Sequence, residues 1–426
     1  MSSVKKALAG KRPKVGSLIR RAGLSALNSR PWQATSRWIR GAAAIERLEI
    51  QYDGRGLNAP VVVYFGDGPA KIYQILQWLP IFEELNRTHK VALVLRSHST
   101  LLELRKITKL PLVLKRRFDP LQDFYHELDP KVALYVNNGV RNFQSLGYAP
   151  MVHVHINHGE SDKVSMVSNQ VKAYDRVLVA GPAAIERHRR ALIEFDFNKL
   201  VEIGRPQLDI DVHSTLPTTR SRTVMYAPTW EGENDANNYT SVDLFGVSIV
   251  EALLDLPDTR IVYKPHPRVE TSEHLEIVEA DARIRELIEA ANVNGAEHIV
   301  SMQGDILPMF ADVDLMITDV SSVGLDFLYL RPEAPIILTD RWDDLESLRH
   351  DSPISHATPV ISRSTEAQLR TAIAEALESD PHIDDRWRLR SYYFGERAVG
   401  ESTRAFVDTV SDLIKTRQAD LAAMGE

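Results

Sequence analysis

The sequence predicts an α/β protein with two doubly wound domains that face a cleft, preceded by a basic helical segment. From residue 59 onward, short runs rich in valine and isoleucine alternate with amphipathic segments, which is typical of α/β units on a parallel sheet. The chain has 426 residues, more than one ordinary core holds, so two domains are expected. A content of 44% apolar and 26% charged residues is typical of a folded globular protein.

Five strands are expected in the first half of the chain, because each is a short apolar run of the kind that parallel sheets bury. These runs are residues 61–65, 91–95, 132–136, 151–156 and 176–179. A helix over residues 71–85 is expected between the first two strands, after a turn at Gly66-Asp67-Gly68-Pro69. We predict a first domain over residues 51–200.

A second series of strands and helices begins near residue 200. Its strands are 201–203, 223–226, 260–263, 314–317 and 335–338, and its helices are 244–256, 273–291 and 366–377. The change of series falls at Gly204-Arg205-Pro206-Gln207, which is expected to be a hinge. We predict a second domain over residues 201–383, followed by helices over 384–426 that pack back across the first domain.

The first 50 residues differ from the rest of the chain in charge. Residues 1–45 hold ten lysine or arginine residues and no acidic residue, although the whole chain carries −7. The acidic remainder argues against a nucleic-acid partner. With leucine and tryptophan among its cations, this segment can lie on an anionic membrane surface, which contributes about 1 kcal/mol per basic residue near the surface. A solvated basic tail is the alternative.

Membrane spanning and secretion are not expected. No apolar run near the N-terminus approaches the roughly 20 residues that a spanning helix needs, and Arg20 and Arg21 interrupt any signal-peptide core. The chain has no cysteine, which excludes disulfides, thiolate catalysis and cysteine-bound metals and fits a reducing compartment. We therefore expect a cytoplasmic protein, peripheral on the inner face of the cell membrane.

The most informative stretch is an expected strand, turn and helix over residues 314–332. The turn contains four polar residues, Thr318, Asp319, Ser321 and Ser322. Free backbone N–H groups and the helix dipole make such a helix N-terminus an anion site. The two serine hydroxyls add donors that suit a phosphate or a pyrophosphate. The alternative is that Asp319 or Ser321 merely caps the helix.

A second cluster follows the expected strand over residues 151–156. His158 and Gly159 stand at its exit, where a ligand can approach the glycine backbone closely. An imidazole titrates near neutrality, so His158 is a candidate general base. Lys163, further along the loop, is a candidate contact for a phosphate. A histidine that only supports the end of the strand is the alternative.

A third cluster is centred on His266. Pro265 and Pro267 hold the backbone extended on both sides of this histidine, so the position of its ring is fixed at little entropic cost. Lys264 and Arg268 make the cluster strongly cationic. We interpret it as a functional site, with a structural turn as the alternative.

Two further positions carry polar or cationic residues next to a strand. After the expected strand over 223–226, Pro228 fixes a turn and Thr229 begins a loop that can donate to an anion. Trp230 is a candidate lid or a wall of the cleft. At the hinge, Arg205 is a candidate contact for a phosphate.

Taken together and in this order, the motifs resemble the CDP-glycerol glycerophosphotransferase family. The motifs are His-Gly at 158–159, Tyr-Ala-Pro-Thr-Trp at 226–230, Lys-Pro-His-Pro at 264–267 and Ile-Thr-Asp-Val-Ser-Ser…Asp-Phe…Arg-Pro at 317–332. The resemblance extends over roughly residues 60–415 and implies the GT-B fold of teichoic-acid and capsule polymerases and primases. Val320 stands where the family usually has tyrosine, and Gln207 where arginine is common.

The resemblance implies that a polyol phosphate, with glycerol phosphate expected, moves from a CDP-linked donor to a lipid-linked or polymeric acceptor hydroxyl, releasing CMP. The donor would bind the second domain, and the first would serve the acceptor. The functional histidines of the family correspond to His158, the expected base, and His266. The expected donor and phosphate contacts are Gly159, Arg205, Pro228, Thr229, Lys264, Arg268, Thr318, Asp319, Ser321, Ser322 and Asp326.

Two other functions fit the same sequence. A GT-B glycosyltransferase that uses a nucleotide sugar would have the same architecture and anion turn, with attack at an anomeric carbon. A catalytically inactive scaffold of envelope assembly is the other reading, although both histidines and both serines argue against it. No cofactor is expected, and no metal site either, because the 14 histidines show no convincing metal-binding spacing on a helix.

Overall fold

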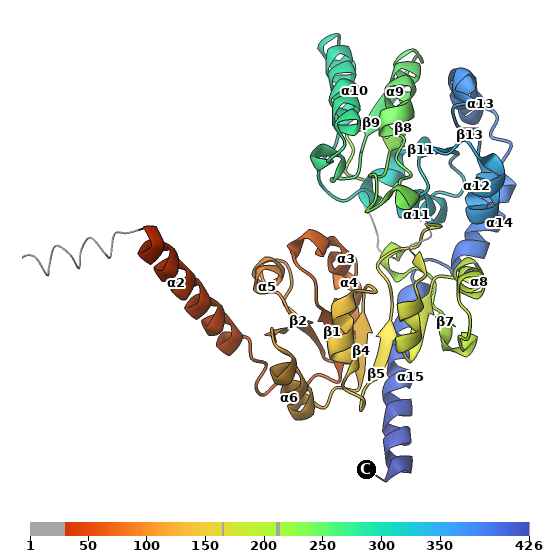
Figure 1. Cartoon of the computed structure of the whole chain (residues 1–426). Helices are drawn as coiled ribbons and strands as arrows, with labels where there is room; N and C mark the ends of the chain where they lie inside the picture. Colours follow the sequence, from red (N-terminus) through yellow and green to blue (C-terminus); the bar gives the residue numbers. More distant parts are fainter. Residues whose placement is uncertain (1–29, 164–165, 210–213, 426) are drawn as a thin grey trace, which may run out of the picture.

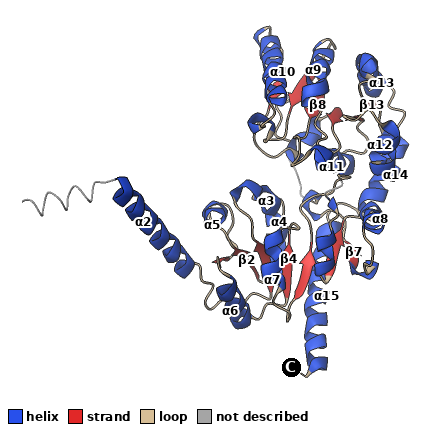
Figure 2. Cartoon of the chain, in the orientation of Figure 1, coloured by secondary structure: helices blue, strands red, loops and turns tan. Residues whose placement is uncertain are grey.

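The computed structural model describes residues 30–163, 166–209 and 214–425, with the backbone alone for residues 30–40. Two sheets of parallel strands, each with helices packed on both faces, make up most of the described chain (Figures 1 and 2). This is the predicted α/β class with two doubly wound domains. Of the basic segment predicted over residues 1–45, residues 1–29 lie outside the described residues.

The first sheet has seven parallel strands in the order β3-β2-β1-β4-β5-β6-β7. The strands are β1 (Val61–Phe65), β2 (Val91–Leu95), β3 (Leu112–Leu114), β4 (Val132–Tyr135), β5 (Val152–His155), β6 (Arg176–Val179) and β7 (Leu200–Glu202). Every residue of β1 is buried, with Val61 and Val63 in one apolar core and Val62 in the core on the opposite face. Burial on both faces explains why the strand reads as a continuous apolar run.

The sequence predicts that the strand at 201–203 opens the second series. In the structure it instead forms the last strand of the first sheet. It is β7, and its Val201 pairs with Leu178 of β6 in parallel register. The prediction was wrong because a short apolar run does not reveal which sheet it joins. The chain leaves this sheet at Gly204, whose φ of 77° lies in the left-handed region that glycine adopts without strain.

The single helix predicted over residues 71–85 is broken into three pieces, η1 (Pro69–Lys71), α3 (Tyr73–Leu76) and α4 (Leu79–Thr88). Pro80 lies at the start of α4, where its missing N–H costs nothing. Because proline cannot continue a helix that precedes it, a new helix begins there. The other helices of this part are α5 (His98–Leu104), α6 (Phe118–Leu128), α7 (Phe143–Leu146) and α8 (Pro182–Ala191).

The second sheet has six parallel strands in the order β10-β9-β8-β11-β12-β13. The strands are β8 (Arg222–Ala227), β9 (Thr259–Tyr263), β10 (Ile299–Val300), β11 (Leu315–Thr318), β12 (Ile336–Thr339) and β13 (Val360–Ile361). Its main helices are α9 (Val247–Leu254), α10 (Leu275–Val293), α11 (Ser322–Leu330), α12 (Leu345–Asp351) and α13 (Leu369–Glu378). Each sheet therefore reverses its strand order near the middle. The reversal lies between β1 and β4 in the first sheet and between β8 and β11 in the second.

The last two helices connect the two sheets again. The helix α14 (Ile383–Phe394) contacts α8 of the first domain, and its Tyr393 belongs to a core of the second. The helix α15 (Glu401–Met424) runs back along the first sheet, where Phe406 and Val410 belong to the same core as β1 (Figure 1). The rings of Phe406 and Trp78 lie 5.2 Å apart.

The helix α2 (Arg30–Gln51) precedes the first sheet and projects away from it in Figure 1. Its Leu48 packs against the core that contains β1, and Glu49 lies 3.9 Å from Arg116. Within the described residues, none of the helices combines the length and the apolar character needed to cross a bilayer.

A buried ion pair ties the hinge to the second domain. The Arg205 Nε donates to Asp326 Oδ1 at 3.1 Å and its Nη2 to Oδ2 at 3.3 Å, in a forked arrangement. Arg205 is 4% exposed and Asp326, on α11, is 7% exposed. Such a pair is costly to break on one side only, because the remaining charge stays buried without a partner.

We therefore expect the variants Arg205→Met and Asp326→Leu each to lower the free energy of unfolding by about 3–5 kcal/mol. The double variant should be more stable than either single variant, since no buried charge is left alone. Urea unfolding of the three variants measures this coupling.

The exposed pair Arg370 and Asp255 offers a matched control, with a distance of 2.9 Å and side chains 60% and 61% exposed. Arg370→Met should change the free energy of unfolding by less than about 1 kcal/mol. A double variant of the buried pair no more stable than the worse single variant would contradict the interpretation.

Candidate active site between the two sheets

The predicted site residues lie at the carboxyl ends of the strands, where ligands bind in doubly wound sheets. Thr229 follows β8 and Asp319 follows β11, and these two strands are neighbours at the switch point of the second sheet. His266 follows β9 and His158 follows β5 of the first sheet. The fold thus carries four separate stretches of the sequence to facing sheet edges.

The side chain of Asp319 joins three strand ends. Its Oδ2 accepts a hydrogen bond of 2.7 Å from the backbone N–H of Thr229, and its Oδ1 accepts one of 2.6 Å from the Thr339 hydroxyl at the end of β12. The Thr318 hydroxyl adds a bond of 2.9 Å to the Ala227 carbonyl. Asp319 is therefore a cross-link between turns and does not cap α11.

Asp319 is completely buried, which determines its acidity. Burial raises the pKa of Asp319 to about 6, while hydrogen bonds from Ser241, Thr339 and Thr229 and the charge of Lys163 act in the opposite direction. Desolvation of a carboxylate is the larger effect here because no cation forms a direct ion pair with Asp319 among the described residues.

The N-terminus of α11 keeps its capacity to bind an anion. Ser321 is the residue before the helix, yet its side chain forms no capping hydrogen bond. The Ser321 Oγ is buried and has no hydrogen-bond partner among the described residues. Ser322 begins the helix close to Gly159, where an added Cβ would lie 3.6 Å from the Ser322 Cβ. Neither residue of the capping alternative, Asp319 or Ser321, acts as a cap.

His158 lies in a sharp bend after β5. Asn157 has a φ of 51°, and its Oδ1 accepts a hydrogen bond of 2.8 Å from the His158 N–H. Burial lowers the pKa of His158 to about 4, and the positive charges of Arg205 and Lys71 lower it further, against a backbone hydrogen bond to Val136. The imidazole is therefore uncharged near neutral pH and able to accept a proton.

Arg205 lies between the two domains but is already engaged. Its guanidinium forms the fork with Asp326, and Nη1 lies 3.4 Å from the His158 carbonyl oxygen. An added Cβ on Gly159 would lie 3.8 Å from Arg205 Nη2. The structure thus groups His158, Gly159, Arg205, Ser322 and Asp326.

His266 lies in the second domain beside the turn after β8. Its N–H donates to the Pro228 carbonyl at 3.0 Å, and its Nδ1 accepts from the Arg268 N–H at 3.2 Å. The neutral ring therefore carries its proton on Nε2, as a donor toward a ligand. Burial lowers the pKa of His266 to about 4, as do the charges of Lys163, Arg268 and Lys264.

The Trp230 ring contacts both His266 and the neighbouring cation Arg268. The Trp230 ring stacks with His266 at 5.9 Å between centroids, and the Arg268 guanidinium lies 3.6 Å from the centroid of Trp230. Lys264 is 5% exposed, and burial lowers its pKa although Asp305 raises it. Among the described residues, no group of His, Asp or Glu is arranged to hold a metal ion.

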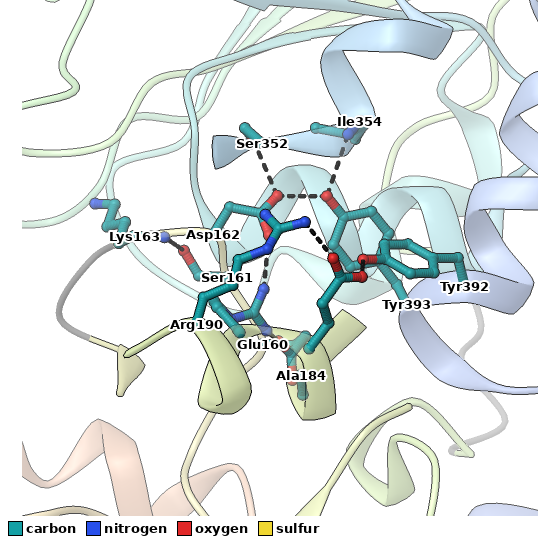
Figure 3. A network of polar contacts seen from close by, with 12 residues as sticks. Glu160, Ser161, Asp162, Lys163, Ala184, Arg190, Ser352, Ile354, Tyr392 and Tyr393 are labelled. Carbon is teal, nitrogen blue, oxygen red and sulfur yellow. Dashed lines mark hydrogen bonds and ion pairs between the residues drawn. The ribbon is translucent and has the colours of Figure 1, made fainter. Parts of the chain in front are cut away.

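A polar network that we call the clasp holds the loop after β5 against the second domain (Figure 3). Asp162 accepts hydrogen bonds from the hydroxyls of Ser352, at 3.0 Å, and Tyr393. Arg187 of α8 pairs with Asp162 at 2.7 Å and with Glu160. The clasp therefore connects β5, α8, α12 and α14.

Sequence reasoning missed the partners that organise the predicted residues. Thr339 is not among the predicted site residues, although it ends a strand next to β11, where the strand-end rule places ligand contacts. Ser241 and the clasp residues leave no local pattern, because their partners are far away in the sequence.

Solved structures share this architecture at low sequence identity. A putative UDP-N-acetylglucosamine 2-epimerase from Listeria monocytogenes has a TM-score of 0.55 and 14% identity, covering 85% of this chain and 98% of its own. The wall teichoic acid polymerase TagF has a TM-score of 0.52 and 14% identity, covering 90% and 99%. A glycosyltransferase from Rickettsia africae has a TM-score of 0.51 and 12% identity, covering 83% and 98%. The predicted GT-B-like fold is confirmed.

No curated protein matches the sequence. A family model does match it, over residues 89–411, and is described as CDP-glycerol:poly(glycerophosphate) glycerophosphotransferase. The matched region contains both histidines and the turn before α11. Because it spans most of the chain, the predicted resemblance is confirmed: the protein belongs to the CDP-glycerol:poly(glycerophosphate) glycerophosphotransferase family.

Proposed function

We propose that this enzyme transfers glycerol phosphate from CDP-glycerol to a hydroxyl of a lipid-linked or polymeric acceptor, in the synthesis of a teichoic-acid-type or capsule-type polymer. The observation that carries the proposal is the N-terminus of α11. It presents an unpartnered buried hydroxyl, Ser321, and uncapped N–H groups next to a loop that carries an uncharged histidine. An anion and a deprotonatable hydroxyl are the two chemical features that this arrangement suits.

In the proposed step, an acceptor hydroxyl attacks the phosphorus that bears the glycerol. The new bond joins the acceptor oxygen to that phosphorus, and the bond from phosphorus to the bridging oxygen breaks, so that CMP leaves with the electron pair. His158 takes the hydroxyl proton, which its low pKa permits because the ring is already deprotonated. A positioned base of this kind contributes about 10²–10⁴-fold in rate.

The other site residues would stabilise the charge that moves to the leaving group. Phosphoryl transfer needs alignment and charge stabilisation more than covalent help. The Nε2–H of His266, the hydroxyls of Ser321 and Ser322 and the dipole of α11 would donate to the diphosphate. Lys264 and Arg268 add positive charge around His266.

A glycosyltransferase that uses a nucleotide sugar is the second candidate. It is favoured by the fold shared with the epimerase and the glycosyltransferase above. Attack at an anomeric carbon would then release the whole nucleoside diphosphate.

The released nucleotide distinguishes the two candidates. Incubated with CDP-glycerol, CDP-ribitol and UDP-sugars in the presence of a lipid-linked acceptor, the enzyme should release CMP from CDP-glycerol. Chromatography of the nucleotides measures this. Release of UDP from a UDP-sugar, without CMP from either CDP-polyol, would establish the second candidate and reject the first.

His158→Ala and His266→Ala should each lower the rate of CMP release by at least about 100-fold, because the base or a charge-stabilising donor is lost. Circular dichroism and urea unfolding check that the variants stay folded. His126→Ala provides the control, since this ring packs at the edge of Tyr148, away from the proposed site. Near-normal turnover in either site variant would remove that histidine from the mechanism.

We also propose that residues 1–45 bring the enzyme to an anionic membrane surface, where a lipid-linked acceptor would be found. Their ten basic residues and absence of acids support this. The full chain should sediment with vesicles that contain phosphatidylserine and not with neutral phosphatidylcholine vesicles. Deletion of residues 1–40 should abolish sedimentation, and retained binding after the deletion would reject the proposal.

A further inference from the structure

The loop that follows β5 delivers a lysine of the first domain into the site of the second. We propose that Lys163 is a further catalytic residue, whose ammonium group contacts the donor diphosphate, so that residues of both domains complete the donor site. This inference rests on the proposed function, because it names a contact to the same donor.

The surroundings of Lys163 leave its charge available. Its Nζ donates to the Thr229 hydroxyl at 3.2 Å and lies 5.5 Å from the centroid of the Tyr239 ring. Among the described residues, no carboxylate lies within 4.0 Å of this nitrogen. A lysine that served only to join the domains would normally end on a carboxylate or on several carbonyl oxygens. Here it ends on one hydroxyl, that of Thr229 in the loop after β8.

One buried carboxylate, Asp319, acts on this cation without forming an ion pair with it. Asp319 raises the pKa of Lys163, which shows that it lies within electrostatic reach. Its two carboxylate oxygens accept hydrogen bonds from Thr229 and Thr339, and among the described residues Asp319 makes no direct contact with the Lys163 ammonium group. Burial lowers the pKa of Lys163 to about 8, so the ammonium form persists at neutral pH at a cost in solvation.

Lys163 also adds to an excess of positive charge around one ring. Its charge is the largest single electrostatic influence on His266, ahead of those of Arg268 and Lys264. Three cations around an uncharged imidazole repel one another unless an anion lies between them. A diphosphate, with its two adjacent charged groups, matches this arrangement.

The clasp keeps Lys163 in place. Its neighbour Asp162 is held by Ser352, Tyr393 and Arg187, and the Lys163 N–H donates to the Ser161 hydroxyl at 3.2 Å (Figure 3). The backbone from which the side chain extends is therefore anchored to both domains. An ammonium positioned in advance stabilises charge on the diphosphate oxygens without reorganisation during the reaction.

The test compares Lys163→Met and Lys163→Arg with Lys109→Met, an exposed lysine of the first domain as control. Lys163→Met should lower kcat/KM for CDP-glycerol by about 100-fold or more. Its free energy of unfolding, measured with urea, should stay close to that of the wild type. Lys163→Arg should recover part of the loss, and Lys109→Met should match the wild type.

The pH profile separates catalysis from a structural role. The groups that face Lys163 are Thr229, Asp319, His266 and Tyr239, and both Asp319 and His266 change charge below pH 7. In the wild type, kcat/KM should fall above pH about 8 as the ammonium loses its proton. In Lys163→Arg this decline should move to higher pH, because arginine keeps its charge. An unchanged decline would overturn the proposal.

Binding without turnover separates this proposal from the proposed function. By calorimetry, Lys163→Met should weaken the binding of CDP and leave that of cytidine unchanged. If the wild type releases CMP and Lys163→Met does so equally well, the proposal fails and the function stands. If the enzyme turns over no CDP-polyol but its binding of CDP still depends on Lys163, the proposed function is rejected and the contact of Lys163 with the diphosphate is supported. A wild type that does not bind CDP overturns the proposal.

Discussion

One buried carboxylate organises the site. Asp319 joins the ends of β8, β11 and β12 through hydrogen bonds from Thr229 and Thr339, and it does so without an ion pair to any described residue. Because it is fully occupied by these strands, it does not cap α11, and the N–H groups of that helix remain available. Ser321 and Ser322 follow directly in the chain, at the start of that helix. The turn can bind an anion because the Asp319 carboxylate accepts hydrogen bonds from Thr229 and Thr339 and not from the first N–H groups of α11.

The two domains meet through polar contacts that also carry site residues. The fork between Arg205 and Asp326 fixes the hinge against α11, and the clasp around Asp162 fixes the loop after β5. His158 precedes both Asp162 and Arg205 in the sequence and lies on the same stretch of chain that these two connections hold. Interfaces of this kind couple the approach of the domains to the geometry of the site, so residues that never touch a substrate still determine where the histidines lie.

Much of the fold follows from local sequence signals. The strands at 61–65, 91–95 and 176–179 have the predicted bounds, because each is long enough to give an apolar run. The strands β3, β10 and β13 have two or three residues and give no such run. The strand-end rule located His158, His266 and the α11 turn, whereas the fork at Arg205 and the clasp could not be predicted, because their partners lie more than 100 residues away in the chain.

The path of the chain has a consequence for its biosynthesis. The first sheet ends at β7, yet its core is completed by Phe406 and Val410 of α15, after the whole second sheet has been made. Domains usually fold as they leave the ribosome, the N-terminal one first. Here the N-terminal unit emerges early with Trp78 not yet covered by Phe406, and α15, which is translated after the whole second sheet, completes this packing. The core of the first sheet therefore reaches its final packing only after the second sheet has been translated.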